Sequence, residues 1–357
     1  MMVVAAFVFV LPSAAFGSWI MERVDTGSIL YPSIAMFGNA SQAVYYAAGP
    51  GDLIYAVRDG SAWSFSAIDT AGDTGKYPSL ALDSSGQPAI AYLNDSSGNL
   101  MYAERTGSVW ALEVAGSGRL PSLALDAAGN PHVTYRNASG GLSYATRVGG
   151  IWSSQQLVAS SNVWESSLAL DSSGNPHISY NDGDKLYYTE WSGSAWDSRF
   201  VDNVGSIRCA SSLVLGSDGN PLIAYHGTTS ADGGKYAAWD GSSWSIEEFD
   251  SGLVRDPWLV LDPAGRPNIG YCVAGASPSV NLAIFDGSQW HTEIVDQTFT
   301  NGFCSLAIDS AGLQHFLYNR SDGLYYASEV PEPASVITLA TMAVVALLAR
   351  PGRRRRA

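Results

Sequence analysis

Cysteine, charge and long apolar runs are all scarce in this sequence of 357 residues. Three cysteines are too few for a disulfide framework, and no pair of them has the spacing of a metal-binding motif. Charged residues make up only 15% of the chain, and the formal net charge of −14 argues against nucleic acid as a partner. Nucleophile elbows and phosphate-binding glycine loops are also missing. Glycine and proline are abundant instead, at 37 and 16 residues, which favours many short elements over long helices.

The two clearest apolar runs lie at the ends of the chain. The first extends from Val3 to Leu11 and is followed by small residues, among them Ala15 and Gly17. Small side chains at such positions are typical of a signal peptidase site, so we expect residues 1–17 to be a signal peptide, cleaved before Ser18. The protein is therefore expected to be exported, with signal peptidase as a processing partner.

Residues 330–357 contain three parts in a defined order. Pro331, Glu332 and Pro333 come first, an uncharged run from Ala334 to Ala349 follows, and Arg353, Arg354, Arg355 and Arg356 close the chain. The uncharged run predicts a C-terminal transmembrane helix whose arginines stay on the cytoplasmic side. This arrangement resembles the PEP-CTERM sorting signal. The resemblance implies an exosortase as partner, an exopolysaccharide-producing Gram-negative host, and a location in the cell envelope or extracellular matrix. The alternative is an ordinary membrane anchor, which does not need the Pro-Glu-Pro motif.

The middle of the chain, residues 18–329, repeats one unit at intervals of 43 to 47 residues. Three copies are nearly identical and begin at Pro78, Pro121 and Ser166 with the pattern Ser-Leu-Ala-Leu-Asp-x-x-Gly-x-Pro. We take the first apolar residue of this pattern as the anchor of each unit. The anchors are Ile34, Leu80, Leu123, Leu168, Leu213, Leu259 and Leu306. A tyrosine stands twelve residues after every anchor, from Tyr46 to Tyr318.

Each unit is predicted to form four short strands. Alternating apolar residues between turn signals are typical of half-buried antiparallel strands. The Asp-x-x-Gly segment predicts a tight turn after the first strand, in which the carboxylate caps backbone amides. The fourth strand opens with tryptophan in six units, from Trp63 to Trp290.

The ends of the repeat region predict the topology. The last unit stops after its third strand, at Glu329, whereas the segment from Trp19 to Asp25 matches the fourth strand of the other units. A chain of this kind closes into a ring when its first strand pairs with its last. We therefore predict an all-β fold, a seven-bladed β-propeller of four-stranded antiparallel blades closed by the N-terminal strand. An open solenoid would leave that first strand without a partner.

The repeated aromatic and acidic residues are expected to pack blades together and to build turns, since residues shared by every blade usually do so. His132, His177 and His315 occupy one repeat position on separate blades, so we expect packed histidines and no metal site. No cofactor is predicted.

Function is expected where the units differ, in the loops beside the central channel. The residues predicted to bind a ligand there are Arg119, Arg136, Trp164, Arg208, Arg255, Trp258 and Arg320. Arginines would pair with carboxylates or sulfates, and the tryptophans would stack on sugar rings. A solvated rim of mixed charge is the competing interpretation.

These features predict a non-catalytic surface protein that binds extracellular polysaccharide or forms part of a matrix. An extracellular glycan-cleaving hydrolase and a purely structural surface protein are the alternatives, since carboxylate pairs are defined only in space. Cys272 and Cys304 fall on neighbouring units, which predicts a disulfide between them.

Overall fold

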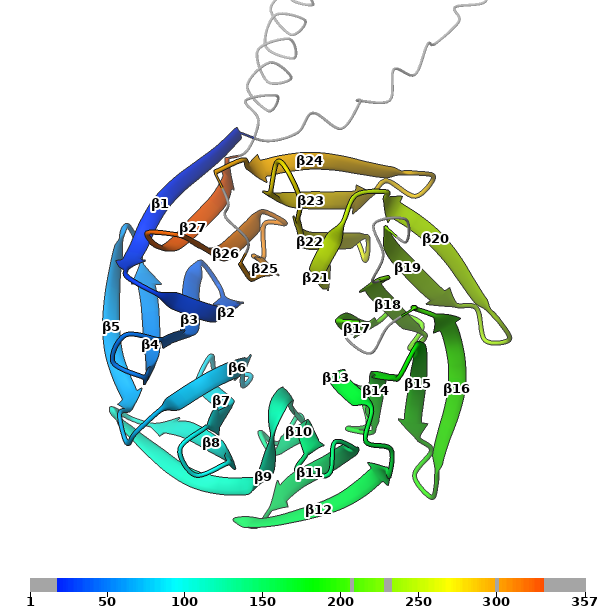
Figure 1. The fold of residues 1–357 in the computed structure, drawn as a ribbon, viewed down its shortest axis with the longest axis horizontal. Helices are drawn as coiled ribbons and strands as arrows, with labels where there is room; N and C mark the ends of the chain where they lie inside the picture. Colours follow the sequence, from blue (N-terminus) through cyan, green and yellow to red (C-terminus); the bar gives the residue numbers. More distant parts are fainter. Residues whose placement is uncertain (1–17, 206–208, 228–232, 299–301, 331–357) are drawn as a thin grey trace, which may run out of the picture.

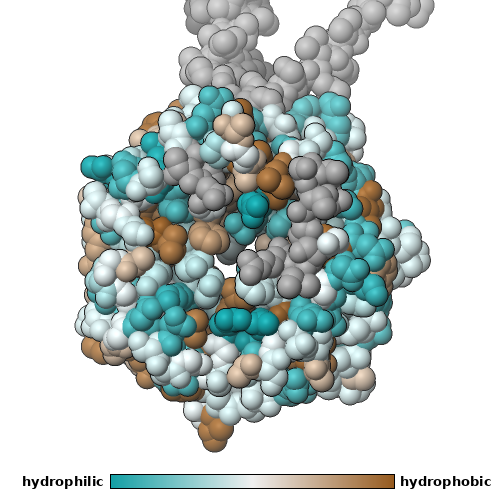
Figure 2. Space-filling view, viewed as in Figure 1, coloured by the Kyte–Doolittle hydropathy of each residue, from teal (hydrophilic) through white to brown (hydrophobic). Residues whose placement is uncertain are grey.

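The computed structural model describes residues 18–205, 209–227, 233–298 and 302–330. These ranges contain 27 β-strands and no helix. The strands form a ring around a central axis, with one strand of each group nearest the axis (Figure 1), and an opening remains at the centre of the ring (Figure 2). The predicted signal peptide, the Pro-Glu-Pro motif, the C-terminal helix and the arginine cluster lie outside the described residues. Within those residues, no helix is long and apolar enough to span a bilayer.

Hydrogen bonds join the strands into six antiparallel sheets. The first sheet consists of β2 (Ile29–Phe37), β3 (Ala40–Ala47), β4 (Asp52–Asp59) and β5 (Ala62–Asp69). The next consists of β6 (Thr74–Leu82), β7 (Pro88–Asn94), β8 (Asn99–Thr106), β9 (Val109–Leu125), β10 (Pro131–Asn137), β11 (Leu142–Val148) and β12 (Ile151–Val158). The third consists of β13 (Val163–Leu170), β14 (Pro176–Asp182), β15 (Lys185–Trp191) and β16 (Trp196–Asn203).

The remaining three sheets complete the ring. One consists of β17 (Ser211–Leu215), β18 (Pro221–His226), β19 (Gly234–Trp239) and β20 (Trp244–Asp250). Another consists of β21 (Val254–Leu261), β22 (Pro267–Val273), β23 (Ser279–Phe285) and β24 (Trp290–Asp296). The last consists of β25 (Cys304–Ile308), β26 (Gln314–Arg320), β27 (Gly323–Val330) and β1 (Ser18–Thr26).

The number of separate sheets is six, not the predicted seven. The difference lies in β9, which is 17 residues long. Its first part, up to Ser117, pairs with β8, and its second part, from Gly118, pairs with β10. Elsewhere a loop separates the outer strand of one unit from the inner strand of the next, whereas here the backbone stays extended through Ser117 and Gly118. One continuous strand therefore joins two four-strand groups into a single seven-stranded sheet.

The predicted pairing of the first and last strands is confirmed. β1 runs antiparallel to β27, with Ser18 opposite Val330 and Thr26 opposite Gly323. Trp19 packs edge-on against Phe316 in the same sheet, with ring centroids 5.5 Å apart. The two ends of the repeat region consequently lie side by side (Figure 1).

The Asp-x-x-Gly turns form as predicted. In the turn after β13, the Asp171 carboxylate accepts hydrogen bonds from the backbone N–H groups of Ser173 and Asn175, both at 2.8 Å. Gly174 has a φ of 81°, which glycine adopts without steric cost. The unit that has Gly216 in place of this aspartate keeps the backbone bonds of the turn, and Asp218 bonds Asn220 instead.

The first unit departs from the predicted spacing. Its turn is one residue shorter, so Ile34 lies opposite Ala43, nine residues on, whereas Leu80 lies opposite Ile90. Tyr45 therefore takes the place of the repeated tyrosine, and the assignment of Tyr46 to this position is wrong.

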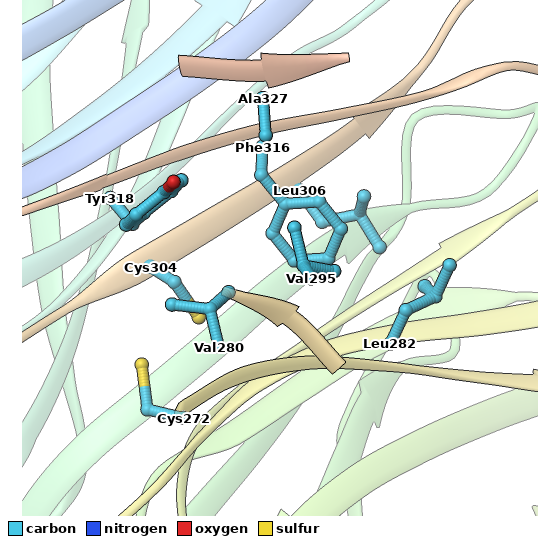
Figure 3. Close-up of a cluster of buried hydrophobic side chains, with 9 residues drawn as sticks. All are labelled: Cys272, Val280, Leu282, Val295, Cys304, Leu306, Phe316, Tyr318 and Ala327. Atoms are coloured by element: carbon cyan, nitrogen blue, oxygen red, sulfur yellow. The ribbon is translucent and has the colours of Figure 1, made fainter. Parts of the chain in front are cut away.

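The hydrophobic core is divided among the contacts between neighbouring four-strand groups. Seven buried clusters are present in the described residues, each built from two groups that are adjacent in the ring. One cluster combines Val280 and Leu282 of β23 with Leu306 of β25 and Phe316 of β26 (Figure 3). The second strand of each group is the most deeply buried, and β7 is buried along its whole length.

Candidate functional site

A β-bulge in the inner strands redirects side chains toward the axis. In β2, β6, β9 and β21 the pairing with the next strand skips the residues three and two positions before the anchor. In β13 it skips the residues four and three positions before the anchor. A bulge of this kind bends the strand and changes the direction in which its side chains point. The residue three positions before each anchor consequently lines the channel.

Four of these bulge residues adopt a backbone conformation that is rare outside glycine. Tyr31, Tyr77, Leu120 and Asp256 have φ values of 55°, 53°, 56° and 47°, and a proline follows each of them. Left-handed backbone in a residue with a side chain costs about 1–3 kcal/mol. The packing of the ring sustains this strain at one repeat position.

Together these residues line a pocket of about 310 Å³ on the axis. At this repeat position each unit contributes one lining residue. In chain order they are Tyr31, Tyr77, Leu120, Glu165, Ala210, Asp256 and Phe303.

One side of this ring is apolar. The Tyr31 ring lies between those of Tyr77 and Phe303, at centroid distances of 4.2 and 4.5 Å. Leu120 extends the same side and is buried. We call these four residues the apolar arc.

The opposite side carries two carboxyl groups separated by the small side chain of Ala210. Burial, and to a smaller extent the charge of Asp256, raises the pKa of Glu165 to about 8. Burial also raises the pKa of Asp256 to about 6, although Arg255 acts in the opposite direction. In the described part of the chain neither carboxyl group forms a hydrogen bond or an ion pair through its side chain. We call Glu165, Ala210 and Asp256 the acidic arc.

Below this ring, serine hydroxyls join neighbouring units around the channel. The serine preceding one anchor accepts a hydrogen bond from the backbone N–H of the next anchor, at 2.9 to 3.3 Å. The serines are Ser33, Ser79, Ser122, Ser167, Ser212 and Ser305. Trp258 occupies the corresponding position in the remaining unit. Trp258 therefore lies in the channel wall within β21. Its predicted position in a rim loop is wrong.

Three of the predicted binding residues come together at the rim. The guanidinium groups of Arg119 and Arg136 lie over the ring of Trp164, 5.8 and 5.5 Å from its centroid. Arg136 donates to the carbonyl oxygen of Val163 at 2.5 Å, and the nearby charge of Arg119 adds to burial in lowering the pKa of Arg136. Among the described residues, neither arginine forms an ion pair.

The other predicted residues do not join this cluster. Arg320 is paired with the buried Asp296 at 2.6 Å and covers the Tyr325 ring, so its charge is already compensated. Arg255 is exposed on β21, three repeat units further along the chain than Arg119. Arg208 lies outside the described residues.

The repeated aromatic side chains pack between neighbouring units, and the repeated histidines are packed against tyrosines of their own units. Trp110 meets Tyr55 edge-on at a centroid distance of 5.1 Å, and five further tryptophan–tyrosine pairs have the same arrangement. The hydroxyl of Tyr92 donates to Asp69 of the preceding unit at 2.9 Å. His177 contacts the hydroxyl of Tyr188, and burial lowers the pKa of this histidine. Within the described ranges, no group of three or more His, Cys, Asp or Glu side chains could hold a metal ion.

The predicted disulfide is not formed, because all three cysteines are free thiols in the structure. The expected proximity is present nonetheless: Cys272 and Cys304 lie at one end of the same buried cluster (Figure 3). Burial and the neighbouring Cys304 thiol raise the pKa of Cys272.

Sequence reasoning missed the axial pocket. Glu165 and Asp256 appear in the sequence as charges among the rim loops, and the bulge that turns them inward has no local signature. The available signal was positional: the residue three places before the anchor varies widely, while its neighbours repeat.

No protein-family model and no curated protein matches the chain. Solved structures do match its fold. An ulvan lyase of polysaccharide lyase family PL25 aligns with a TM-score of 0.57 and 12% identity, over 87% of this chain and 94% of the lyase. A protein of unknown function from Dyadobacter fermentans aligns with a TM-score of 0.56 and 10% identity, over 90% of this chain and all of the other.

A fungal lectin from Aleuria aurantia, described as a six-bladed β-propeller that recognises fucose, aligns with a TM-score of 0.51 and 18% identity. The match covers 68% of this chain and 87% of the lectin. Together with the ring of four-stranded units, these likenesses define the described chain as an all-β propeller. The matched structures include both lectins and a lyase.

Proposed function

We propose that this protein is an exported, surface-associated β-propeller that binds an acidic polysaccharide without cleaving it. We count its blades as seven, with β9 shared between two of them. In this proposal signal peptidase removes residues 1–17, and an exosortase recognises residues 330–357. The protein then remains in the cell envelope or the extracellular matrix.

One observation carries the proposal: two arginines are held over a single indole, in an acidic protein, and neither forms an ion pair with a carboxylate of the described residues. Like charges so close together repel each other, and an anion placed between them removes that cost. Guanidinium groups bind carboxylate and sulfate oxygens in a bidentate manner, and an indole offers a face to a sugar ring. Uronic acids and sulfated sugars provide both features.

The matched structures support a glycan as the ligand class. One is a lectin that recognises fucose, and a second structure of the ulvan lyase is described as bound to a disaccharide unit of glucuronic acid and sulfated rhamnose. Fucose and the ulvan disaccharide are ligands of the matched lectin and lyase. They make an acidic glycan a reasonable first probe for this one.

The test is retention of the purified protein on immobilised acidic polysaccharides, with alginate and ulvan as probes. Arg119→Ala should weaken retention by about tenfold, the usual effect of removing one charge-assisted contact, and raised salt should weaken the wild type. Arg23→Ala is the matched control, since Arg23 is an exposed arginine on β1. Equal retention of both variants would overturn the proposed site.

The same samples separate the competing functions. Release of reducing ends or of unsaturated sugars by the wild type would identify an enzyme, and the protein could then not be called a simple binder. Absence of both retention and turnover on every polysaccharide, the producer's own included, would leave a structural role.

A further inference from the structure

The axial pocket has an apolar side and an acidic side, and the packing of the ring does not require this difference. The seven lining residues at this repeat position lie on the innermost strands of the ring or directly before them (Figure 1). Positions that pack the units together repeat closely, as the serine row does. This position instead separates into the apolar arc and the acidic arc.

Without a ligand, the buried negative charges of the acidic arc destabilise the folded state. Glu165 and Asp256 are partly buried, repel each other and form no ion pair among the described residues, although the charge of Arg255 acts on Asp256. Carboxyl groups in such a setting are stabilised by a cation that enters between them. Ala210, the smallest side chain of the ring, leaves space at that point.

The apolar arc restricts what kind of cation fits. A metal ion gains nothing from the rings of Tyr31, Tyr77 and Phe303, and two carboxyl groups are fewer ligands than calcium normally requires. An organic cation can use both arcs, because its ammonium group meets the carboxylates while its body lies against the aromatic rings. The wall of the pocket therefore matches an ammonium group attached to a ring with an apolar face.

We propose that the axial pocket binds an amino sugar with a free, protonated amino group, held by Glu165 and Asp256 and packed against Tyr31, Tyr77 and Phe303. This inference rests on the proposed function in choosing a sugar as the body of the ligand. Trp164 of the rim and Glu165 of the pocket are adjacent in sequence, so one glycan chain can reach both. A polysaccharide with acidic and amino sugars would then occupy rim and pocket together.

The test uses small probes that do not need the rim. Glucosamine and a chitosan tetrasaccharide are titrated into the purified full chain by calorimetry, with N-acetylglucosamine and its tetrasaccharide as matched controls. Removal of the positive charge by acetylation should weaken binding at least tenfold, the effect of losing a charge-assisted contact. Equal binding of the free and acetylated sugars would overturn the proposal.

Two kinds of variant locate the site. Glu165→Gln combined with Asp256→Asn should abolish the preference for the free amine, while Arg23→Ala, at an exposed arginine of β1, should leave it unchanged. Ala210→Leu keeps both charges and fills the space between them, so it should block binding as well. If the double variant does not fold, as judged by its circular dichroism spectrum, Ala210→Leu alone decides, and unaltered glucosamine binding by it would overturn the assignment.

Two outcomes distinguish this inference from the proposed function. Retention on acidic polysaccharide that depends on Arg119, without glucosamine binding, would sustain the rim and refute the pocket. Competition by trilysine as strong as that by the chitosan tetrasaccharide would show that the pocket selects an ammonium group on any chain, and would refute the sugar.

Discussion

Glu165 and Asp256 at the centre of the ring have raised pKa values, so their ionised forms destabilise the folded state. A carboxyl group whose pKa is raised by burial holds its proton in the folded state at pH values where the unfolded chain has lost it. For Glu165 this window extends from the ordinary value of 4.5 to about 8. Within the window the folded state binds more protons, so the free energy of unfolding falls as the pH rises.

Glu165→Gln should therefore stabilise the ligand-free protein more at pH 8 than at pH 5. The groups that share this environment are Asp256 of β21 and the Cys209 thiol, whose pKa the Glu165 charge helps to raise. We expect a gain of roughly 1–2 kcal/mol at pH 8, less than the full shift implies, because the side chain is only partly buried. Urea unfolding at both pH values measures the effect.

Glu248→Gln is the control for this experiment. Glu248 is exposed on the outer strand β20, so its substitution should change the unfolding free energy by less than about 0.5 kcal/mol at either pH. A Glu165→Gln variant with the same stability gain at pH 5 and pH 8 would show that Glu165 titrates normally.

The inner strand of each unit combines two functions. In β2, β6 and β13 the serine before the anchor binds the neighbouring unit, and the bulge directs one further residue into the channel. The serine hydrogen bonds form where two inner strands approach each other, so each bond holds a pair of neighbouring units.

Ser79→Ala tests this connection. The Ser79 hydroxyl accepts the backbone N–H of Leu123 at 3.0 Å, and its loss leaves that donor unpaired. We expect the unfolding free energy to fall by about 1–2 kcal/mol. Ser108→Ala, in the exposed turn between β8 and β9, should have almost no effect in the same denaturant titration. Equal stabilities of the two variants would mean that the serine row does not join the units.

The sequence could predict those elements whose signals are local and repeated. The Asp171 turn and the pairing of the Trp19 segment with β27 follow from residue types that recur at fixed spacing. Two features lacked such a signal. The continuity of β9 depends on Ser117 and Gly118 remaining extended, which no residue pattern requires. The described residues therefore form six sheets where seven were expected.

The binding site was predicted only in part for a related reason. Side chains in a strand alternate between faces, and one extra residue reverses the alternation. The bulges at Tyr31 and Asp256 therefore point side chains to the axis where plain alternation places them elsewhere. Arg119, Arg136 and Trp164 were predicted at one rim, with four other residues, from their repeat positions alone, although they lie in strands and not in loops. The ion pair of Arg320 with Asp296 depends on the exact packing of two units, which repeat positions do not give.

The ring as a unit depends on contacts between the two ends of its repeat region. Besides pairing with β27, β1 contributes Asp25, whose carboxylate accepts a 2.5 Å hydrogen bond from the Tyr45 hydroxyl of the next unit. These contacts require β1 to lie in its sheet, but they do not require it to come first in the chain. Val330 and Ser18 are opposite each other, so a short turn could connect β27 directly to β1.

A circular permutant of the described domain tests whether the ring depends on the contacts of β1 or on its place in the chain. It would begin at Ser28, run to Val330, and continue through a short glycine-rich turn into Ser18–Gly27. Gly27 and Ser28 are exposed, and a side chain at Gly27 would meet no neighbouring atom, so new termini there should cost little. We expect thermal unfolding within a few degrees of the parent domain with residues 18–330.

Deletion of residues 18–27 instead exposes the edge of β27 and removes the packing of Trp19, and should give a much less stable, aggregation-prone protein. A permutant as unstable as the deletion would mean that the order of the strands, and not the contacts of β1, holds the ring together.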